Sequence, residues 1–145
     1  MVKDMLKGEI GGIYFSRILE DEDLVKAVKK RVEEAGVKAG IFILIGSLKR
    51  ATLGYYKEGK YRFTQIEGPL EIASCMGNIA VDKEGNTVIH PHIVVADEKG
   101  EAFGGHLMEN SPVGATAELV IIEAKGVHLE RAYDEKTKLN LWKLG

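Results

Sequence analysis

The run Ile41-Phe42-Ile43-Leu44-Ile45 constrains the fold more than any other part of the chain. Five consecutive apolar residues are too few for a buried helix and too uniformly apolar for a strand with one solvent-facing side. The run therefore predicts a strand that is buried on both faces and lies in the centre of a sheet.

Turn-forming residues divide most of the remaining chain into short segments that are typical of strands. The first such segment covers residues 10–18, before the central run. Those after it cover residues 50–56, 61–66, 70–81, 87–96 and 115–123, and a final hairpin falls within residues 127–142. The number and spacing of these segments predict a mainly antiparallel sheet.

One segment has helical periodicity instead. The acidic residues 21–23 mark a helix start, and Gly36 stands where a C-cap glycine is expected. Between them, apolar side chains recur at helical spacing at Leu24, Val28, Val32 and Ala35. We predict an α+β fold in which one helix, or two, packs on the sheet within a single domain of residues 1–145.

Composition excludes several classes of protein. A net charge of −2 over 145 residues gives no general attraction to nucleic acid or to anionic membranes. One cysteine, Cys75, rules out an internal disulfide framework, and its neighbours include no base that would activate it. The sequence has neither a signal-peptide hydrophobic region nor an apolar run of membrane-spanning length, so we expect a cytoplasmic protein without a membrane partner.

Three of the four histidines fall within seventeen residues and predict a metal site. His90 and His92 would share one face of the strand over residues 87–96, and a turn after it could return His106 to that strand. Three imidazoles with an open fourth position suit a divalent ion, zinc above all. The alternative is that these are ordinary solvated side chains. His128 lies outside the group and is expected to be structural.

A three-histidine zinc ion could also activate a water molecule for hydrolysis. Such chemistry needs a group that handles the proton, and Glu71 or Glu118 could supply it. The simpler interpretation of either glutamate is a solvent-facing residue in a strand. Whether the protein is an enzyme therefore stays open.

Basic and aromatic residues are interleaved between positions 49 and 62. The tyrosines are Tyr55, Tyr56 and Tyr61, and the basic residues are Lys49, Arg50, Lys57, Lys60 and Arg62. Basic side chains can neutralise phosphates and aromatic rings can stack on bases, which would make this a nucleic-acid surface. The alternative is a hairpin with a solvated, lysine-rich outer side that protects a sheet edge.

Several motifs in a fixed order resemble the PPC domain, the "plants and prokaryotes conserved" family. They are Gly68-Pro69-Leu70-Glu71-Ile72-Ala73-Ser74, Gly77-Asn78-Ile79, His90-x-His92 and Gly104-Gly105-His106-Leu107. The resemblance covers nearly the whole chain. It implies a mainly antiparallel sheet with packed helices, a homotrimer, and a metal ion held at His90, His92 and His106.

The resemblance also implies a function. It suggests an oligomeric module, associated with DNA or with DNA-bound proteins in transcription, that carries the three-histidine metal site. No Arg-Gly-Arg-Pro or similar AT-hook occurs in the sequence, so minor-groove binding of the plant kind is not expected. A small zinc-dependent hydrolase of unknown substrate is the alternative.

Overall fold

The computed structural model describes residues 4–144, and in this part of the chain it contains one α-helix and eight β-strands. The elements in chain order are β1 (Glu9–Ile18), α1 (Leu24–Ala35), β2 (Gly40–Lys57), β3 (Lys60–Val81), β4 (Thr87–Ala96), β5 (Ala102–Leu107), β6 (Val113–Lys125), β7 (Glu130–Asp134) and β8 (Leu139–Lys143). The predicted α+β class and mainly antiparallel sheet are confirmed. Of the one or two helices predicted, one is present in residues 4–144.

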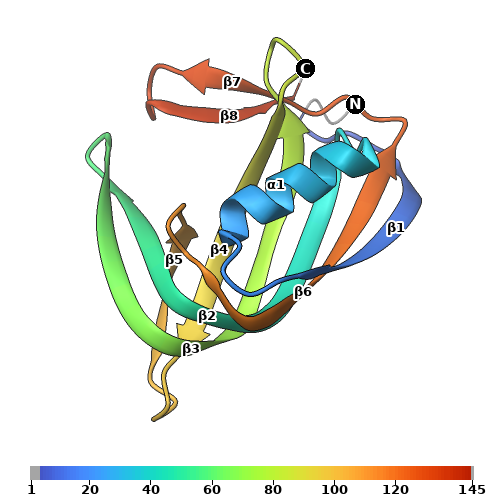
Figure 1. The fold of residues 1–145 in the computed structure, drawn as a ribbon. Helices are drawn as coiled ribbons and strands as arrows, with labels where there is room; N and C mark the ends of the chain where they lie inside the picture. The colour runs from blue at the N-terminus through green and yellow to red at the C-terminus, as the bar shows by residue number, and fades with distance from the viewer. Residues whose placement is uncertain (1–3, 145) are drawn as a thin grey trace.

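The sheet curves until it closes on itself (Figure 1). Strands β1, β6, β2, β3, β4 and β5 pair in that order and are all antiparallel. Strand β5 then returns to β2 at Leu53 and Gly54, which joins β2, β3, β4 and β5 into a ring. The β7–β8 hairpin is attached at one end of β3 through the pair Val81 and Glu130.

Helix α1 begins and ends where the sequence predicts. The Asp23 side chain is the N-cap and accepts a hydrogen bond from the backbone N–H of Lys26 at 3.1 Å. Gly36 ends the helix in the left-handed conformation, with φ at 70°. These caps set the two ends of the helix, and its buried side chains, which include Leu24 and Val28, hold it on one face of the sheet.

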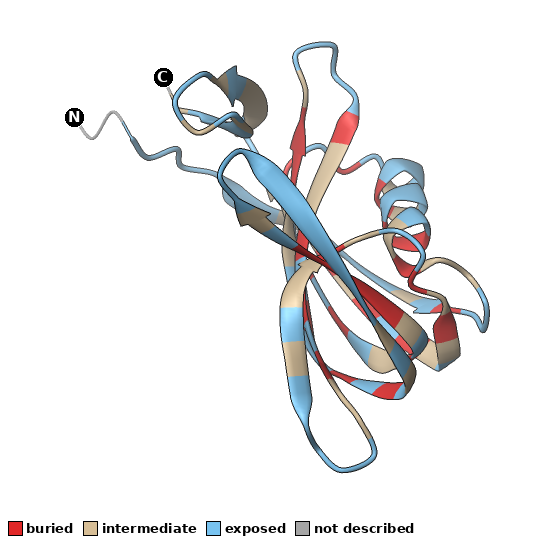
Figure 2. Cartoon of the chain, turned by 90° about the vertical axis from the view of Figure 1, so that its left-hand side faces the viewer, coloured by how far each residue is buried: buried red, intermediate tan, exposed pale blue. Residues whose placement is uncertain are grey.

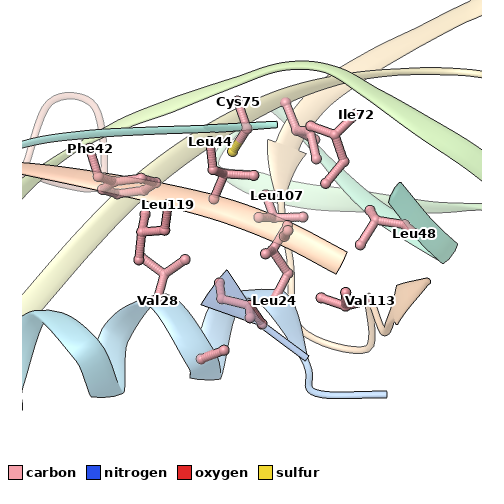
Figure 3. Close-up of a cluster of buried hydrophobic side chains, with 14 of the residues drawn as sticks. Leu24, Val28, Phe42, Leu44, Leu48, Ile72, Cys75, Leu107, Val113 and Leu119 are labelled. Atoms are coloured by element: carbon pink, nitrogen blue, oxygen red, sulfur yellow. The ribbon is translucent and has the colours of Figure 1, made fainter. Parts of the chain in front are cut away.

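The core lies between that helix and the sheet (Figure 3). Leu24 and Val28 of α1 face Phe42 and Leu119, and all four side chains are buried. Gly77 lies opposite Phe42 in the β2–β3 pairing, and a Cβ atom there would come within 2.5 Å of the Phe42 ring. A larger residue at position 77 would therefore displace the largest buried side chain. Figure 2 shows the buried residues gathered where the helix and strands face each other.

The central run is a strand, but the prediction that both its faces are buried is wrong for this chain. Phe42 and Leu44 point into the core, with 1% and 3% of their surface exposed. Ile41, Ile43 and Ile45 point to the opposite face and are 45%, 44% and 58% exposed. The chain has a single helix in residues 4–144, and it covers only one side of the sheet.

Two pairs of predicted strands are continuous in the structure. The run at 41–45 and the segment 50–56 both belong to β2, and the segments 61–66 and 70–81 both belong to β3. Irregular register at Leu44–Gly46 and Leu48–Arg50 bends these long strands without ending them. Cys75 is buried within β3, and burial raises the pKa of its thiol to about 12, which excludes a reactive thiolate at neutral pH.

Candidate metal centre

The three clustered histidines converge on one face of the sheet. His90 and His92 are two residues apart on β4, so their side chains share a face, and His106 of β5 lies directly opposite His92. One ring nitrogen from each residue can be chosen so that all three lie within 4.8 Å of one another. The ring centroids are 4.9 Å apart for His90 and His92, 5.1 Å for His90 and His106, and 5.6 Å for His92 and His106.

Residues around the histidines explain how β4 and β5 can lie close to their neighbouring strands. Pro91 pairs with Gly77 on β3 but lies outside the β4–β5 pairing, which starts at His92. Proline lacks a backbone N–H, and this position does not need a second strand partner. A Cβ atom on Gly105 would come within 2.9 Å of the Gly54 carbonyl oxygen, so glycine lets β5 lie close against β2.

The environment of the cluster favours the neutral form of two of the imidazoles, those of His90 and His106. Burial, and then the neighbouring His90, His92 and Arg131, lower the pKa of His106 from 6.5 to about 4. Burial and Arg131 also lower the pKa of His90. A metal ion binds the neutral form, so neither ring must lose a proton to bind one at pH 7.

One buried nitrogen in the cluster has no partner among residues 4–144. His106 Nδ1 is inaccessible to solvent and makes no hydrogen bond. Such an atom carries a cost unless a ligand satisfies it. Three imidazoles around an open position, one with an unsatisfied nitrogen, fit the donor set of a zinc ion.

Three further residues at the cluster were not predicted from the sequence. The Arg131 Nη2 donates to Asn78 Oδ1 at 2.8 Å and lies 3.3 Å from His90 Nδ1. The Tyr61 ring is 5.4 Å from the His106 ring. Asn78 belongs to one of the motifs that carry the family resemblance, whereas Arg131 is 41 residues from His90 and has no signal in the sequence pattern.

The two glutamates proposed as proton-handling groups do not reach the cluster. Glu71 lies opposite Ala96, four residues along β4 from His92, which corresponds to about 13 Å. Glu118 is on β6, three strand spacings from β4, or roughly 14 Å along the sheet. The structure therefore does not support either glutamate in that role.

The five candidate nucleic-acid residues do not form one surface. Lys49 makes ion pairs with Asp21 at 2.7 Å and with Glu20 at 3.0 Å, and Arg50 donates to the Asn110 side chain. The other three, Lys57, Lys60 and Arg62, are exposed at the tip of the β2–β3 hairpin. Lys57 lies seven residue steps along the extended strand from Arg50, or about 23 Å.

The histidines continue a row of exposed apolar side chains on the same face of the sheet. Strand register aligns Phe15, Val120, Ile43, Met76, His92 and His106 across six strands. Residues opposite each other in register share a face. We define the apolar face as the exposed residues on this side of the sheet, namely Ile13, Phe15, Ile41, Ile43, Ile45 and Met76.

Fold and site together define a class of protein: a curved antiparallel sheet that one helix covers on one face and that carries three converging histidines on the other. The sequence comparison identifies the family. The model of the Plants and Prokaryotes Conserved (PCC) domain, also abbreviated PPC, matches residues 5–125, and the chain belongs to this family.

Solved structures share the fold over almost the whole chain. A metal-containing protein, AF0104 from Archaeoglobus fulgidus, is 31% identical, with a TM-score of 0.87 over 96% of this chain and 98% of that one. A PPC protein from Pyrococcus horikoshii is 31% identical, with a TM-score of 0.88 over 96% and 97%. A protein of Bacteroides thetaiotaomicron, described as a candidate DNA-binding protein, is 25% identical, with a TM-score of 0.83 over 94% of each chain.

Curated relatives are much longer proteins. Two Synechococcus proteins named Bifunctional protein GlmU are 30% identical to this chain over 128 and 127 residues. The match covers 86% of this chain but only 19% of each relative.

Proposed function

We propose that the protein is a self-associating PPC-type module in which His90, His92 and His106 hold one divalent metal ion, with zinc as the best fit. The observation that carries the proposal is the convergence of three ring nitrogens within 4.8 Å, one ring having a buried, unpartnered nitrogen. Support also comes from the metal-containing relative of A. fulgidus. The imidazoles would supply three ligands and leave a fourth position open.

Metal analysis of untagged protein, purified without chelator, tests the metal site. Wild-type protein should contain about one divalent ion per chain after dialysis, and His92→Ala should contain much less. His128→Ala is the matched control, because His128 lies outside the cluster and is bonded to Glu130. Metal-free wild type, or equal metal in wild type and His92→Ala, would count against the proposal.

Self-association is supported by the apolar face. Six large apolar side chains exposed together on one face exceed the scattered exposure that is ordinary on a monomer surface. We infer that further copies of the chain cover this face, and the family resemblance suggests three copies. Because strand register runs from this face directly to His92 and His106, association would bring a neighbouring copy close to the metal site.

DNA binding is a second candidate, supported by one surface. On the β2–β3 hairpin, Lys57 lies opposite Lys60 and Tyr55 opposite Arg62, so these four exposed side chains share a face. Labelled duplex DNA should be retained at low salt, should be released steeply as salt rises, and should bind more weakly to Lys57→Ala/Arg62→Ala. Absence of retention at low salt would refute this candidate.

Hydrolysis is not the preferred function. A metal ion with an open position can activate water, but the mechanism also needs a group that takes the proton. Glu71 and Glu118 lie too far from the histidines to do so. Turnover of hydrolysable esters by metal-loaded protein, lost on replacing His106, would restore the hydrolase alternative.

A further inference from the structure

Arg131 is a sheltered cation beside the histidines that has no acidic partner. Its Nη1 donates to the Asn140 carbonyl oxygen and its Nη2 to Asn78 Oδ1, both at 2.8 Å. Its Nε is buried and makes no hydrogen bond, and no ion pair to Arg131 occurs in residues 4–144. By contrast, the sheltered Arg31 is bonded through two nitrogens to the Glu22 carboxylate. Arg131 is partly buried, and a partly buried charge without a counter-ion carries some of the cost of a buried one, so this arrangement favours an anionic ligand.

Metal binding at the histidines would remove one acceptor from Arg131. A neutral imidazole has one protonated nitrogen and one nitrogen with a free lone pair. The 3.3 Å contact between Arg131 Nη2 and His90 Nδ1 requires the lone pair on Nδ1. When a metal ion takes a lone pair of His90, the remaining nitrogen carries the proton, and His90 no longer offers Arg131 an acceptor.

A metal ion would also bring a second positive charge to the same place. The guanidinium lies within hydrogen-bond distance of a ligand residue, and among the described residues no carboxylate oxygen comes within the 4.0 Å of an ion pair with it. The repulsion between the two cations is strongest where water is excluded. An anion that touches both cations would relieve it.

We propose that Arg131 and the metal ion together form a binding site for a small oxyanion, namely a carboxylate or phosphate group. One end of the guanidinium would hold this group beside the open position of the metal ion. This inference rests on the metal site proposed above and specifies the ligand class that it takes. Guanidinium groups match the geometry of such oxyanions by donating two parallel hydrogen bonds. Nη2, which lies 3.3 Å from His90 Nδ1, is the donor that this side chain offers beside the histidines, whereas Nε has no partner but is enclosed by protein atoms.

The position of Arg131 makes this a feature of the C-terminal hairpin. Residue 131 lies beyond the residues 5–125 that match the family model. Strand β7 carries Arg131, and β8 supplies Trp142, whose ring centre is 5.8 Å from the guanidinium carbon. The hairpin therefore supplies the arginine from outside the matched residues, and Asn78, which lies within them, accepts a hydrogen bond from it beside His90.

Cobalt(II) provides a coloured metal for the test, with inorganic phosphate as the probe. Chelator-treated protein is loaded with one equivalent of cobalt in oxyanion-free buffer, and phosphate is titrated while the visible absorption of the bound ion is recorded. We expect phosphate to change the spectrum of wild-type protein. Arg131→Gln should take up cobalt but bind phosphate between about 10-fold and 100-fold more weakly, since one charge-assisted contact is lost. Arg131→Lys, which keeps the charge without the planar fork, should fall in between.

The controls separate the possible failures. Arg62→Gln, which removes an exposed arginine at the hairpin tip, should bind phosphate as wild type does. Calorimetry with metal-free wild type should show at least 10-fold weaker phosphate binding. Equal phosphate affinity in wild type and both Arg131 variants, or equal affinity with and without cobalt, would overturn the oxyanion site alone. Wild-type protein that takes up no cobalt would overturn the metal site, and the oxyanion site with it.

Discussion

Replacing His106 with leucine should make the metal-free protein more stable than wild type, and should make the protein less stable than wild type when zinc is present. The His106 side chain is largely buried, and its Nδ1 has no hydrogen-bond partner in the described chain. Leucine fills a similar volume without a polar atom. The substitution therefore removes an unsatisfied group from the apo protein and one of three proposed ligands from the metal-loaded protein.

The expected magnitudes follow from the contacts of the ring. An unsatisfied buried polar atom costs about 1–3 kcal/mol. Removing this unsatisfied atom should stabilise the apo protein by that amount. The variant also loses the edge-on contact with the Tyr61 ring, 5.4 Å away between ring centres, which offsets about 0.5–1 kcal/mol of the stabilisation. We expect apo His106→Leu to be about 1 kcal/mol more stable than apo wild type. At a zinc concentration 100 times the dissociation constant, wild type gains about 2.7 kcal/mol and becomes the more stable by roughly 1.7 kcal/mol.

Denaturant unfolding measures the difference in unfolding free energy between wild type and His106→Leu, first with excess chelator and then with the free zinc concentration held constant. Protein concentration must be the same throughout, since self-association also stabilises the folded state. His128→Leu is the matched control: its side chain is exposed and bonded only to Glu130, so its stability should stay within about 0.5 kcal/mol of wild type and its zinc response should be unchanged. An apo His106→Leu protein that is less stable than wild type, or that responds to zinc as wild type does, would refute the reasoning.

Three further predictions concern pH, the core and association. The pKa of His106 is about 4 in the folded protein and near 6.5 in the unfolded protein, so the unfolded state binds more protons between pH 4 and pH 6.5. The unfolding free energy of the apo protein should therefore fall by up to about 3 kcal/mol as the pH is lowered from 6.5 to 4, and by less in His106→Leu. Denaturant titration in the presence of chelator measures this fall. Phe42→Ala should lower the unfolding free energy by about 3–5 kcal/mol, which denaturant unfolding followed by circular dichroism would show as a lower midpoint. Ile43 is half-exposed, so Ile43→Ala should lower the unfolding free energy much less at protein concentrations where the chains are separate. In sedimentation measurements, Ile43→Lys should lower the mass from that of an oligomer to that of a single chain. Lys57→Ala, which is far from the apolar face, should leave the mass unchanged. An unchanged mass in Ile43→Lys would argue against association through that face.

Local sequence signals were sufficient where the determining interactions are themselves local. Asp23 and Gly36 delimit α1 because a cap depends on a few neighbouring backbone groups. Strand β4 occupies the predicted residues 87–96, and alternation along it places His90 and His92 on one face. The short turn after β4 lets β5 fold back beside it, which brings His106 within reach of that strand.

Predictions about what covers a surface were less accurate. The isoleucines of the central run are apolar enough for a fully buried strand, yet in residues 4–144 no helix covers that side, and the C-terminal hairpin reaches it at Asn78 and His90. Lys49 and Lys57 are similar in sequence context. In the folded protein, however, Lys49 has two acidic partners, whereas Lys57 is exposed at the hairpin tip. Burial and pairing depend on residues distant in the chain, which a local pattern does not specify.

The sequence by itself determined the strands, the helix with its caps, and the pairing of two histidines on one strand, because propensity, alternation and turn chemistry act over a few residues. Only the tertiary structure decided that His106 completes the cluster with a buried, unpartnered nitrogen, that Glu71 and Glu118 stay away from it, and that Arg131 lies against His90. Those outcomes depend on strand register and on where the C-terminal hairpin docks. Both are set by the packing of the whole sheet.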